Sequence, residues 1–454
     1  MFSGEVFERF AAQSPVSVMA RAAFEHALSA DAVDALFEEY AQRRYTRDLL
    51  FSQVVDLMAL VVCKVRPSLN AAIKKRTDLR VTRKAVYAKI GRTEPGLGTA
   101  LVRRTADRLL PVLAELSGPP AGPLPGHRVR IVDGNHLPGT EHRIGPLRKT
   151  RAAGLPGQAV VVFDPATGLV TDVIPCEDAH AQERSLTPEV LALVRPADVW
   201  VADRNFCTTR LLFGFVAAGG HFVIRQHGSN LSVRGSSPAV GCGRTPTGTV
   251  SEGSLRVADA GGAELIVRRV TITLDTPTRG GTAEIHVLTS LPAEVSAVVI
   301  AEVYRGRWRI EGASHELEAA IRGEVETLGY PKAALFAFCV ALVAFNVLRV
   351  VKAAIGAGHG IDAEAQVSGS DLAEEVAGTR RGMVIAIAPS VWSVFARMTP
   401  VELAEMLRGL GRQVWLAGFR KQPRGPKKPR PPRESGAKAK HYATARLLQK
   451  RLQK

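Results

Sequence analysis

Cysteine is scarce in this sequence and is never closely paired. The 454 residues include five cysteines, and no two of them form a CxxC motif. Disulfide-stapled secreted domains and zinc modules both need several closely spaced cysteines. The scarcity argues against both classes and fits a reducing compartment, so we expect a cytoplasmic protein.

Several other signals are missing. No G-x4-GK[ST] motif is present, so no nucleotide cofactor is predicted. The N-terminus, MFSGEVFERFAAQSP, carries acidic residues and lacks the apolar centre of a signal peptide. The apolar runs at 49–65 and 333–348 are short or interrupted by polar residues, which favours buried core helices over membrane spans. We therefore expect no membrane partner.

Acidic residues are almost absent from the C-terminal end, where basic residues accumulate. The formal net charge is +17, and residues 420–454 hold seven Lys and six Arg against one Glu. A basic, Pro-rich segment of this kind is typical of a polyanion-binding tail. We predict a disordered tail over 419–454 that contacts nucleic acid; a solvated tail without a partner is the alternative.

The first 118 residues show helical spacing of apolar side chains, with Ser29 and Thr46 as candidate N-caps. Within them, PSLNAAIKKRTDLRVTRKAVYAKIGR predicts a short helix, a turn and a second helix capped by Thr82. The outward residues of the second helix are predicted to include Arg83, Lys84, Tyr87 and Lys89. A helix-turn-helix would place such residues on DNA. An ordinary helical hairpin with a basic surface explains the pattern equally well.

Strand patterns begin after the Pro/Gly-rich boundary at 117–127. RVRIVDGNH predicts one strand, QAVVVFDPATGLVTDVIPC two strands joined by a tight turn at 164–168, and DVWVADRNF and HFVIRQ two more. The helices ERSLTPEVLALV and TTRLLFGFVAAGG lie between the later strands. Three strands, helix, strand, helix, strand is the order of a ribonuclease-H-like mixed sheet, in which antiparallel neighbours come first and parallel pairs follow.

We therefore predict an α/β fold with a ribonuclease-H-like core, interrupted by a small β insertion and flanked by helical regions. The predicted domains are a helical N-terminal DNA-binding region (1–118), the first part of the core (127–227), the insertion (228–291), the last core helices (292–355), a helical C-terminal region (356–418) and the tail (419–454).

Three carboxylates occupy positions that such a sheet uses for chemistry. Asp133 is predicted to end the first strand, Asp203 ends the fourth, and Glu311 lies on the helix after the insertion. The first and fourth strands are adjacent in this fold, so the two aspartates would project side by side. Close carboxylates repel unless a cation lies between them. Hard oxygen ligands suit Mg²⁺ or Mn²⁺, and two such ions support in-line phosphodiester displacement.

The stretch YRGRWRIEGASHELE surrounds Glu311 with cations. Helical period would place Tyr304, Arg307, Glu311 and Glu318 on one stripe. Trp308 lies one residue beyond this stripe, and we predict its burial against the sheet. A solvated, ion-paired helix face is the alternative interpretation of the stripe.

The chain resembles the DDE transposases of bacterial insertion sequences, in the branch called insertion sequence family 4. The resemblance rests on IVDGNHL, VADRNF and YRGRWRIE, in that order. The family's helix signature is Y-x2-R-x3-E-x6-K. This sequence matches it at Tyr304, Arg307 and Glu311 and has Glu318 where the lysine is expected. The resemblance implies that Asp133, Asp203 and Glu311 bind the catalytic metals, Mg²⁺ or Mn²⁺.

The resemblance also implies a DNA-binding surface. Tyr304 and Arg307 would touch the backbone of the element end, or Tyr304 would be a core aromatic. Arg204 would contact phosphate or pair with a carboxylate, and Arg322 is the nearest base that could replace the missing lysine. The insertion lacks the Trp with which some relatives stack a base, which argues against a hairpin pathway.

The implied activity is that of a cytoplasmic, nucleoid-associated DNA transposase that acts as a homodimer on double-stranded DNA, at element ends and target. It would cut element ends and join the freed 3′-hydroxyl to target DNA. Two alternatives remain open from the sequence. One is a ribonuclease-H-like nuclease without strand transfer, and the other is an inactive DNA-binding protein derived from a transposase.

Overall fold

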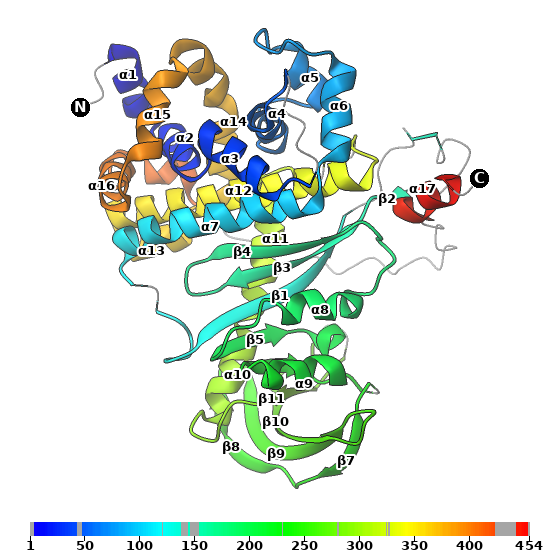
Figure 1. Cartoon of the computed structure of the whole chain (residues 1–454). Helices are drawn as coiled ribbons and strands as arrows, with labels where there is room; N and C mark the ends of the chain where they lie inside the picture. Colours follow the sequence, from blue (N-terminus) through cyan, green and yellow to red (C-terminus); the bar gives the residue numbers. More distant parts are fainter. Residues whose placement is uncertain are drawn as a thin grey trace.

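The structure is a computed structural model of the whole chain (Figure 1). It describes residues 4–42, 48–119, 121–137, 144–145, 154–228, 230–278, 281–323, 325, 327–422 and 442–452. Thr46, a candidate N-cap, lies outside these residues. Ser29 does cap a helix, because its hydroxyl accepts a hydrogen bond from the Ala32 N–H group.

Helices fill the N-terminal part of the chain. They are α1 (Glu5–Gln13), α2 (Pro15–Ala27), α3 (Ala30–Tyr40), α4 (Phe51–Val62), α5 (Leu69–Lys74), α6 (Arg83–Arg92) and α7 (Pro95–Ser117). The predicted short helix, turn and second helix correspond to α5 and α6, and the Thr82 hydroxyl caps α6 as expected. Lys89 does not point outward as predicted. Its ammonium group donates to the Leu49 carbonyl and lies 5.0 Å from the centre of the Phe37 ring.

The strands of the core follow α7. They are β1 (Arg128–His136), β2 (Gly154–Leu155), β3 (Gln158–Asp164), β4 (Leu169–Cys176), β5 (Asp198–Ala202) and β6 (His221–Arg225). The main sheet runs β4-β3-β1-β5-β6 in this part, with β1, β3 and β4 antiparallel neighbours. β5 is parallel to both β1 and β6. This is the mixed sheet that the sequence predicts, with its parallel strands in the middle.

Alternating side chains give the sheet two apolar faces. Ile131 and Val201 pack in one buried cluster with helices α7 and α12 (Pro331–His359). Val132 and Trp200 pack in a second cluster with α8 (Thr187–Leu191) and α9 (Thr209–Ala217). Because successive strand residues point to opposite faces, this period-two pattern buries both sides of the sheet between helical layers (Figure 1).

The β-rich insertion is continuous with the core sheet. Its strands are β7 (Ser232–Ser236), β8 (Val240–Thr245), β9 (Gly248–Ala258), β10 (Glu264–Leu274) and β11 (Glu284–Thr289). β11 pairs with β6, and β10, β9 and β7 follow outward, while β8 also pairs with β9. The insertion therefore lengthens the central sheet to ten strands within the described part of the chain.

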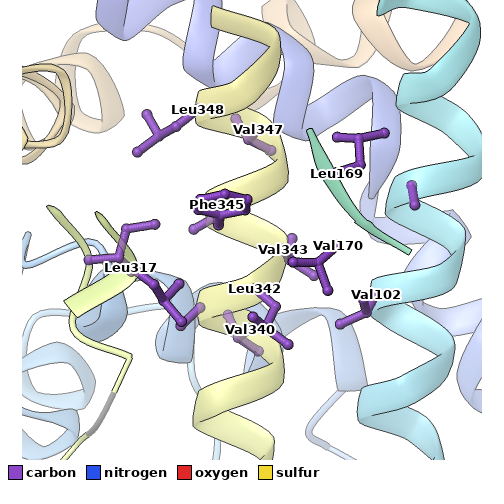
Figure 2. Packing of buried hydrophobic residues seen from close by; sticks show 14 of the residues in the cluster. Val102, Leu169, Val170, Leu317, Val340, Leu342, Val343, Phe345, Val347 and Leu348 are labelled. Atoms are coloured by element: carbon purple, nitrogen blue, oxygen red, sulfur yellow. The ribbon is translucent and has the colours of Figure 1, made fainter. Parts of the chain in front are cut away.

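Helix α12 is the central helix of the larger core. By length and composition it could span a membrane, but 94% of its most apolar window is buried inside the protein. It lies beside α7 and β4 and reaches α11 (Trp308–Ala320) on its other side (Figure 2). The expected buried core helix at 333–348 is confirmed.

One polar side chain lies inside this apolar helix. Asn346 is completely buried, and its amide exchanges two hydrogen bonds with the backbone of Val170. The Val170 N–H group donates to Asn346 Oδ1 (2.9 Å), and Asn346 Nδ2 donates to the Val170 carbonyl (2.8 Å). Because these bonds engage the open edge of β4, they fix the position of α12 against the sheet.

Further helices follow α12, and part of the tail is folded. They are α13 (Ile361–Gln366), α14 (Gly369–Ala386), α15 (Pro389–Arg397) and α16 (Pro400–Gly411). The prediction of a disordered tail is wrong for its last part. β12 (Tyr442–Ala443) pairs with β2, and α17 (Thr444–Leu452) holds Arg446 2.8 Å from Asp178. Residues 423–441 lie outside the described part of the chain.

Replacing Asn346 with leucine tests how α12 is held. We expect Asn346→Leu to lower the free energy of unfolding by about 2–4 kcal/mol, because the Val170 N–H and carbonyl groups lose their partners in a buried site. Val343→Ala on the same helix, which removes apolar volume alone, should cost about 1–2 kcal/mol. Urea unfolding followed by circular dichroism measures both. Equal losses would show that the two hydrogen bonds add nothing to packing.

Candidate active site

Asp133 and Asp203 lie side by side at one edge of the sheet. The parallel pairing of β1 with β5 ends at Val132 and Ala202, and each aspartate is the next residue on its strand. The predicted adjacency of the first and fourth strands is confirmed. One detail differs, because β1 continues to His136 through its pairing with β3 and does not end at Asp133.

Local hydrogen bonds hold both aspartates in place. Asp203 is the N-cap of the short 3-10 helix η3 (Arg204–Phe206), and its Oδ1 accepts from the Asn205 N–H group at 2.8 Å. Asp133 Oδ1 accepts from the N–H group of Gly134 at 3.1 Å. An aspartate that caps a helix start is the residue type favoured there, so Asp203 orders the turn that carries it.

The helix carrying Glu311 is not continuous with the preceding one. α10 (Ala297–Arg305) ends before Gly306, and α11 starts at Trp308. The intervening backbone makes tight i→i+3 bonds, such as Arg307 N–H to the Tyr304 carbonyl at 3.0 Å. Gly306 and Arg307 nevertheless keep helical dihedral angles, and the predicted stripe holds for its first three members, because Tyr304 is hydrogen-bonded to Arg307 and Arg307 pairs with Glu311.

Arg307 connects the third carboxylate to the first. Its Nη2 atom lies 2.6 Å from Glu311 Oε1, and its Nη1 atom lies 3.9 Å from Asp133 Oδ2. The Arg307 side chain is 11% exposed, whereas that of Glu311 is 53% exposed. A single, largely buried guanidinium thus stands between carboxylates that come from β1 and α11.

The electrostatics of Asp133 reflect this crowding. Burial raises the pKa of Asp133 to about 6, and repulsion from Asp203 and Glu311 adds to the effect. Arg307 and the Gly134 N–H group lower the pKa but do not cancel the rise. The ionised form of Asp133 is therefore less stable than that of an aspartate in water, as expected for a buried carboxylate that shares its site with others.

The donor set fits a hard divalent cation. Asp133, Asp203 and Glu311 supply carboxylate oxygens, which Mg²⁺ and Mn²⁺ prefer. Among the described side chains, no three acidic, His or Cys residues already stand at metal-ligand spacing. The guanidinium of Arg307 lies between Glu311 and Asp133, and it therefore keeps these two carboxylates apart.

A basic cleft of about 360 Å³ opens beside Asp203. It is lined by Asp203, Arg204, Arg225, Thr282, Tyr304 and Arg307. Arg225 was missed from the sequence, although it ends β6, the next parallel strand at the same edge of the sheet. Asp133 and Asp203 were identified because residues that end adjacent strands meet at one edge of the sheet. The same reasoning would have identified Arg225.

Tyr304 is buried, whereas Trp308 is exposed to solvent. Tyr304 is 6% exposed, and burial raises the pKa of its hydroxyl, which is hydrogen-bonded to Arg307. Trp308 is 50% exposed, so the prediction of its burial is wrong. It lies where α11 begins and lines a second cleft with residues of the insertion, among them Thr247.

The remaining predicted DNA contacts lie in other parts of the structure. Arg322 donates from Nη1 to the Pro67 carbonyl at 2.6 Å and from its backbone to Val62, so it holds the connection between α4 and α5. Arg83 donates to Asn70 at 3.0 Å. The other residues predicted on α6, Lys84 and Tyr87, are exposed. Glu318 falls within α11, but its side chain is outside the described residues.

A charge-removing substitution tests the place of Arg307. We expect Arg307→Met to lower the free energy of unfolding at pH 7.5 in chelator by about 1–3 kcal/mol, since Asp133 and Glu311 lose their shared counter-ion. Arg305→Met is the control, because Arg305 forms an exposed pair with Glu302 at 3.2 Å and should cost less than about 0.5 kcal/mol. Equal losses in urea unfolding would contradict a special role for Arg307.

Comparison with known proteins bears on the same region. No curated protein matches the chain. A family model described as Transposase DDE domain matches residues 124–345. The matched range starts before β1 and ends inside α12, so it includes Asp133, Asp203 and Glu311. Such a domain implies polynucleotidyl transfer on DNA and generally uses divalent metals. Residues 124–345, a little under half of the chain, correspond to a transposase DDE domain.

Proposed function

We propose that the protein is the DNA transposase of an insertion sequence of the family 4 type. The observation that carries the proposal is the site at the sheet edge. Adjacent parallel strands bring Asp133 and Asp203 together, Arg307 links Glu311 to Asp133, and a basic cleft opens beside Asp203. This combination supports phosphodiester chemistry on a polyanion.

Asp133, Asp203 and Glu311 would hold Mg²⁺ or Mn²⁺. Bound ions of this kind activate an attacking oxygen and stabilise the leaving oxygen in an in-line displacement at phosphorus. In the first reaction, water attacks the phosphodiester at the element end and a 3′-hydroxyl leaves. In the second, this hydroxyl attacks a target phosphodiester, one P–O bond forms and another breaks, and the element is joined.

The arginines of the cleft would hold the scissile phosphate. Arg204 follows Asp203, and Arg225 and Arg307 line the same cleft. A guanidinium fork matches the oxygens of a phosphate and keeps its charge at every working pH. The buried Tyr304, hydrogen-bonded to Arg307, would set the direction in which that guanidinium points.

Contacts away from the active site would supply the rest of the DNA affinity. Lys84 and Tyr87 are exposed on α6, and the C-terminal segment from Arg420 is rich in Lys and Arg. Phosphate contacts of this type make binding strongly dependent on salt. Because two element ends must be processed together, we propose a homodimer on DNA that acts in the cytoplasm.

Substitution of the three carboxylates tests the chemistry. Asp133→Ala, Asp203→Ala and Glu311→Gln should each reduce metal-dependent cleavage of DNA bearing the element ends by roughly 10³-fold or more. DNA binding, measured by gel shift, should stay within a few-fold of the native protein. Glu405→Gln, an exposed carboxylate on α16, serves as the control. Cleavage that survives all three substitutions would refute the assignment.

The same assay separates the activities that the sequence left open. Cleaved ends joined to a second, labelled target DNA support transposition. Cleavage without joined products would indicate a nuclease without strand transfer. DNA binding with neither product, at every Mg²⁺ or Mn²⁺ concentration, would indicate an inactive DNA-binding descendant.

Glu318 can be tested by charge reversal. If the site keeps the family geometry, Glu318→Lys should tighten binding to element ends by roughly 5–10-fold at low salt, because a repulsive charge near phosphate becomes attractive. Glu405→Lys changes the net charge equally on α16 and should have a smaller effect. Titrations at several salt concentrations by fluorescence anisotropy measure both. Matching gains for the two variants would mean that position 318 does not face DNA.

A further inference from the structure

A fourth carboxylate reaches the same edge of the sheet from a different element. Glu183 begins the 3-10 helix η2 (Glu183–Leu186), which lies between β4 and β5 in the chain. It is not on any of the three elements that carry Asp133, Asp203 and Glu311. η2 packs against η3, so Glu183 approaches Asp203 from the side of α8.

Gly134 makes room for this carboxylate. A Cβ atom built on Gly134 would overlap the Oε1, Cδ and Cγ atoms of Glu183. Gly134 follows Asp133 directly, and by strand alternation it faces the opposite side of the sheet, where α8 and α9 pack. The need for glycine here is therefore spatial: any side chain would push Glu183 away from the strand beside Asp133.

The Glu183 carboxylate has a hydrogen-bond partner, but one of its two oxygen atoms has none. Its side chain is hydrogen-bonded to that of Asn205, whose backbone N–H group donates to Asp203. Its Oε2 atom has no accessible surface and no hydrogen-bond partner among the described residues. Burial raises the pKa of Glu183, and repulsion from Asp203 and then Asp133 raises it further.

A buried carboxylate oxygen without a donor is costly, because it has lost water and gained nothing in exchange. Here the cost is increased by two neighbouring carboxylates of the same sign. Among the described residues no ion pair reaches Glu183: the neighbouring Arg184 donates to Gln182, and Arg307 is engaged with Glu311 and Asp133 on the other face of the sheet. A hard cation would satisfy the Glu183 oxygen and relieve the repulsion at once.

We propose that Glu183 is a fourth carboxylate of the divalent-cation site, contributing an oxygen beside Asp133 and Asp203 from the face opposite to Glu311. The inference rests on the proposed function, because it concerns the same cation site. In this proposal Glu183 strengthens cation binding from the face of the sheet on which α8 and α9 pack.

Mn²⁺ binding to the full-length protein tests this without any turnover. We expect Glu183→Gln to weaken Mn²⁺ affinity at pH 7.5 by at least about 10-fold, measured by calorimetry and by the electron paramagnetic resonance signal of free Mn²⁺. Glu189→Gln, an exposed carboxylate on neighbouring α8, should bind as the native protein does. Native affinity in Glu183→Gln would overturn the proposal.

Thermal unfolding in chelator distinguishes a cation ligand from a purely structural residue. Without metal, Glu183→Gln should unfold at the same or a higher temperature than the native protein, because a source of repulsion is removed. A lower unfolding temperature together with native Mn²⁺ affinity would show a structural role and overturn the proposal.

Asp133→Asn separates failure of this inference from failure of the proposed function. If Asp133→Asn loses Mn²⁺ binding and Glu183→Gln keeps it, only the assignment of Glu183 is wrong. If Asp133→Asn also binds Mn²⁺ with native affinity, the cation site of the proposed function is wrong as a whole. The assignment of Glu183 to that site is then wrong as well.

Discussion

The parallel pairing of β1 with β5 is the interaction on which the rest of the site depends. Its register ends at Val132 and Ala202, so two aspartates that are 70 residues apart in sequence become neighbours. Burial of both sheet faces strongly specifies this register. A slip by one residue would exchange Ile131 and Val132 between the two apolar clusters and turn Asp133 towards the wrong helices. Packing that stabilises the fold thus also positions the chemistry.

Arg307 explains how the protein tolerates a crowded acidic site. Close carboxylates cost stability unless positive charge is near, and a single guanidinium lies between Glu311 and Asp133. The same guanidinium lines the basic cleft, where a phosphate would compete with the carboxylates for it. The largely exposed Glu311 can leave this pair more easily than the buried Arg307 can. In the proposed function, DNA binding and the release of Glu311 for a cation would be coupled through this one side chain.

The sequence predicted the core well because both of its signals are local. Alternating apolar residues identified the strands, and the strand order determined that Asp133 and Asp203 would be adjacent. The wrong predictions concern contacts between separate elements. Helical period did not reveal the exposure of Trp308, which depends on how α11 meets the insertion. Glu183 resembled an ordinary helix start, and its relation to the site depends on the space that distant Gly134 leaves.

The insertion belongs to the site and is not an appended module. β11 pairs with β6 so that Val287 lies opposite Arg225, and the Gln226 N–H group donates to the His286 carbonyl at 2.8 Å. The direction of Arg225 is therefore set by a strand of the insertion, and Thr282 from the same region lines the cleft. Any shift of the ten-stranded sheet at β11 would move Arg225, the proposed phosphate contact, relative to Asp203. The length of the insertion can vary at β7, whose residues are all exposed, at much lower cost than at β11, where its backbone pairs directly with the core.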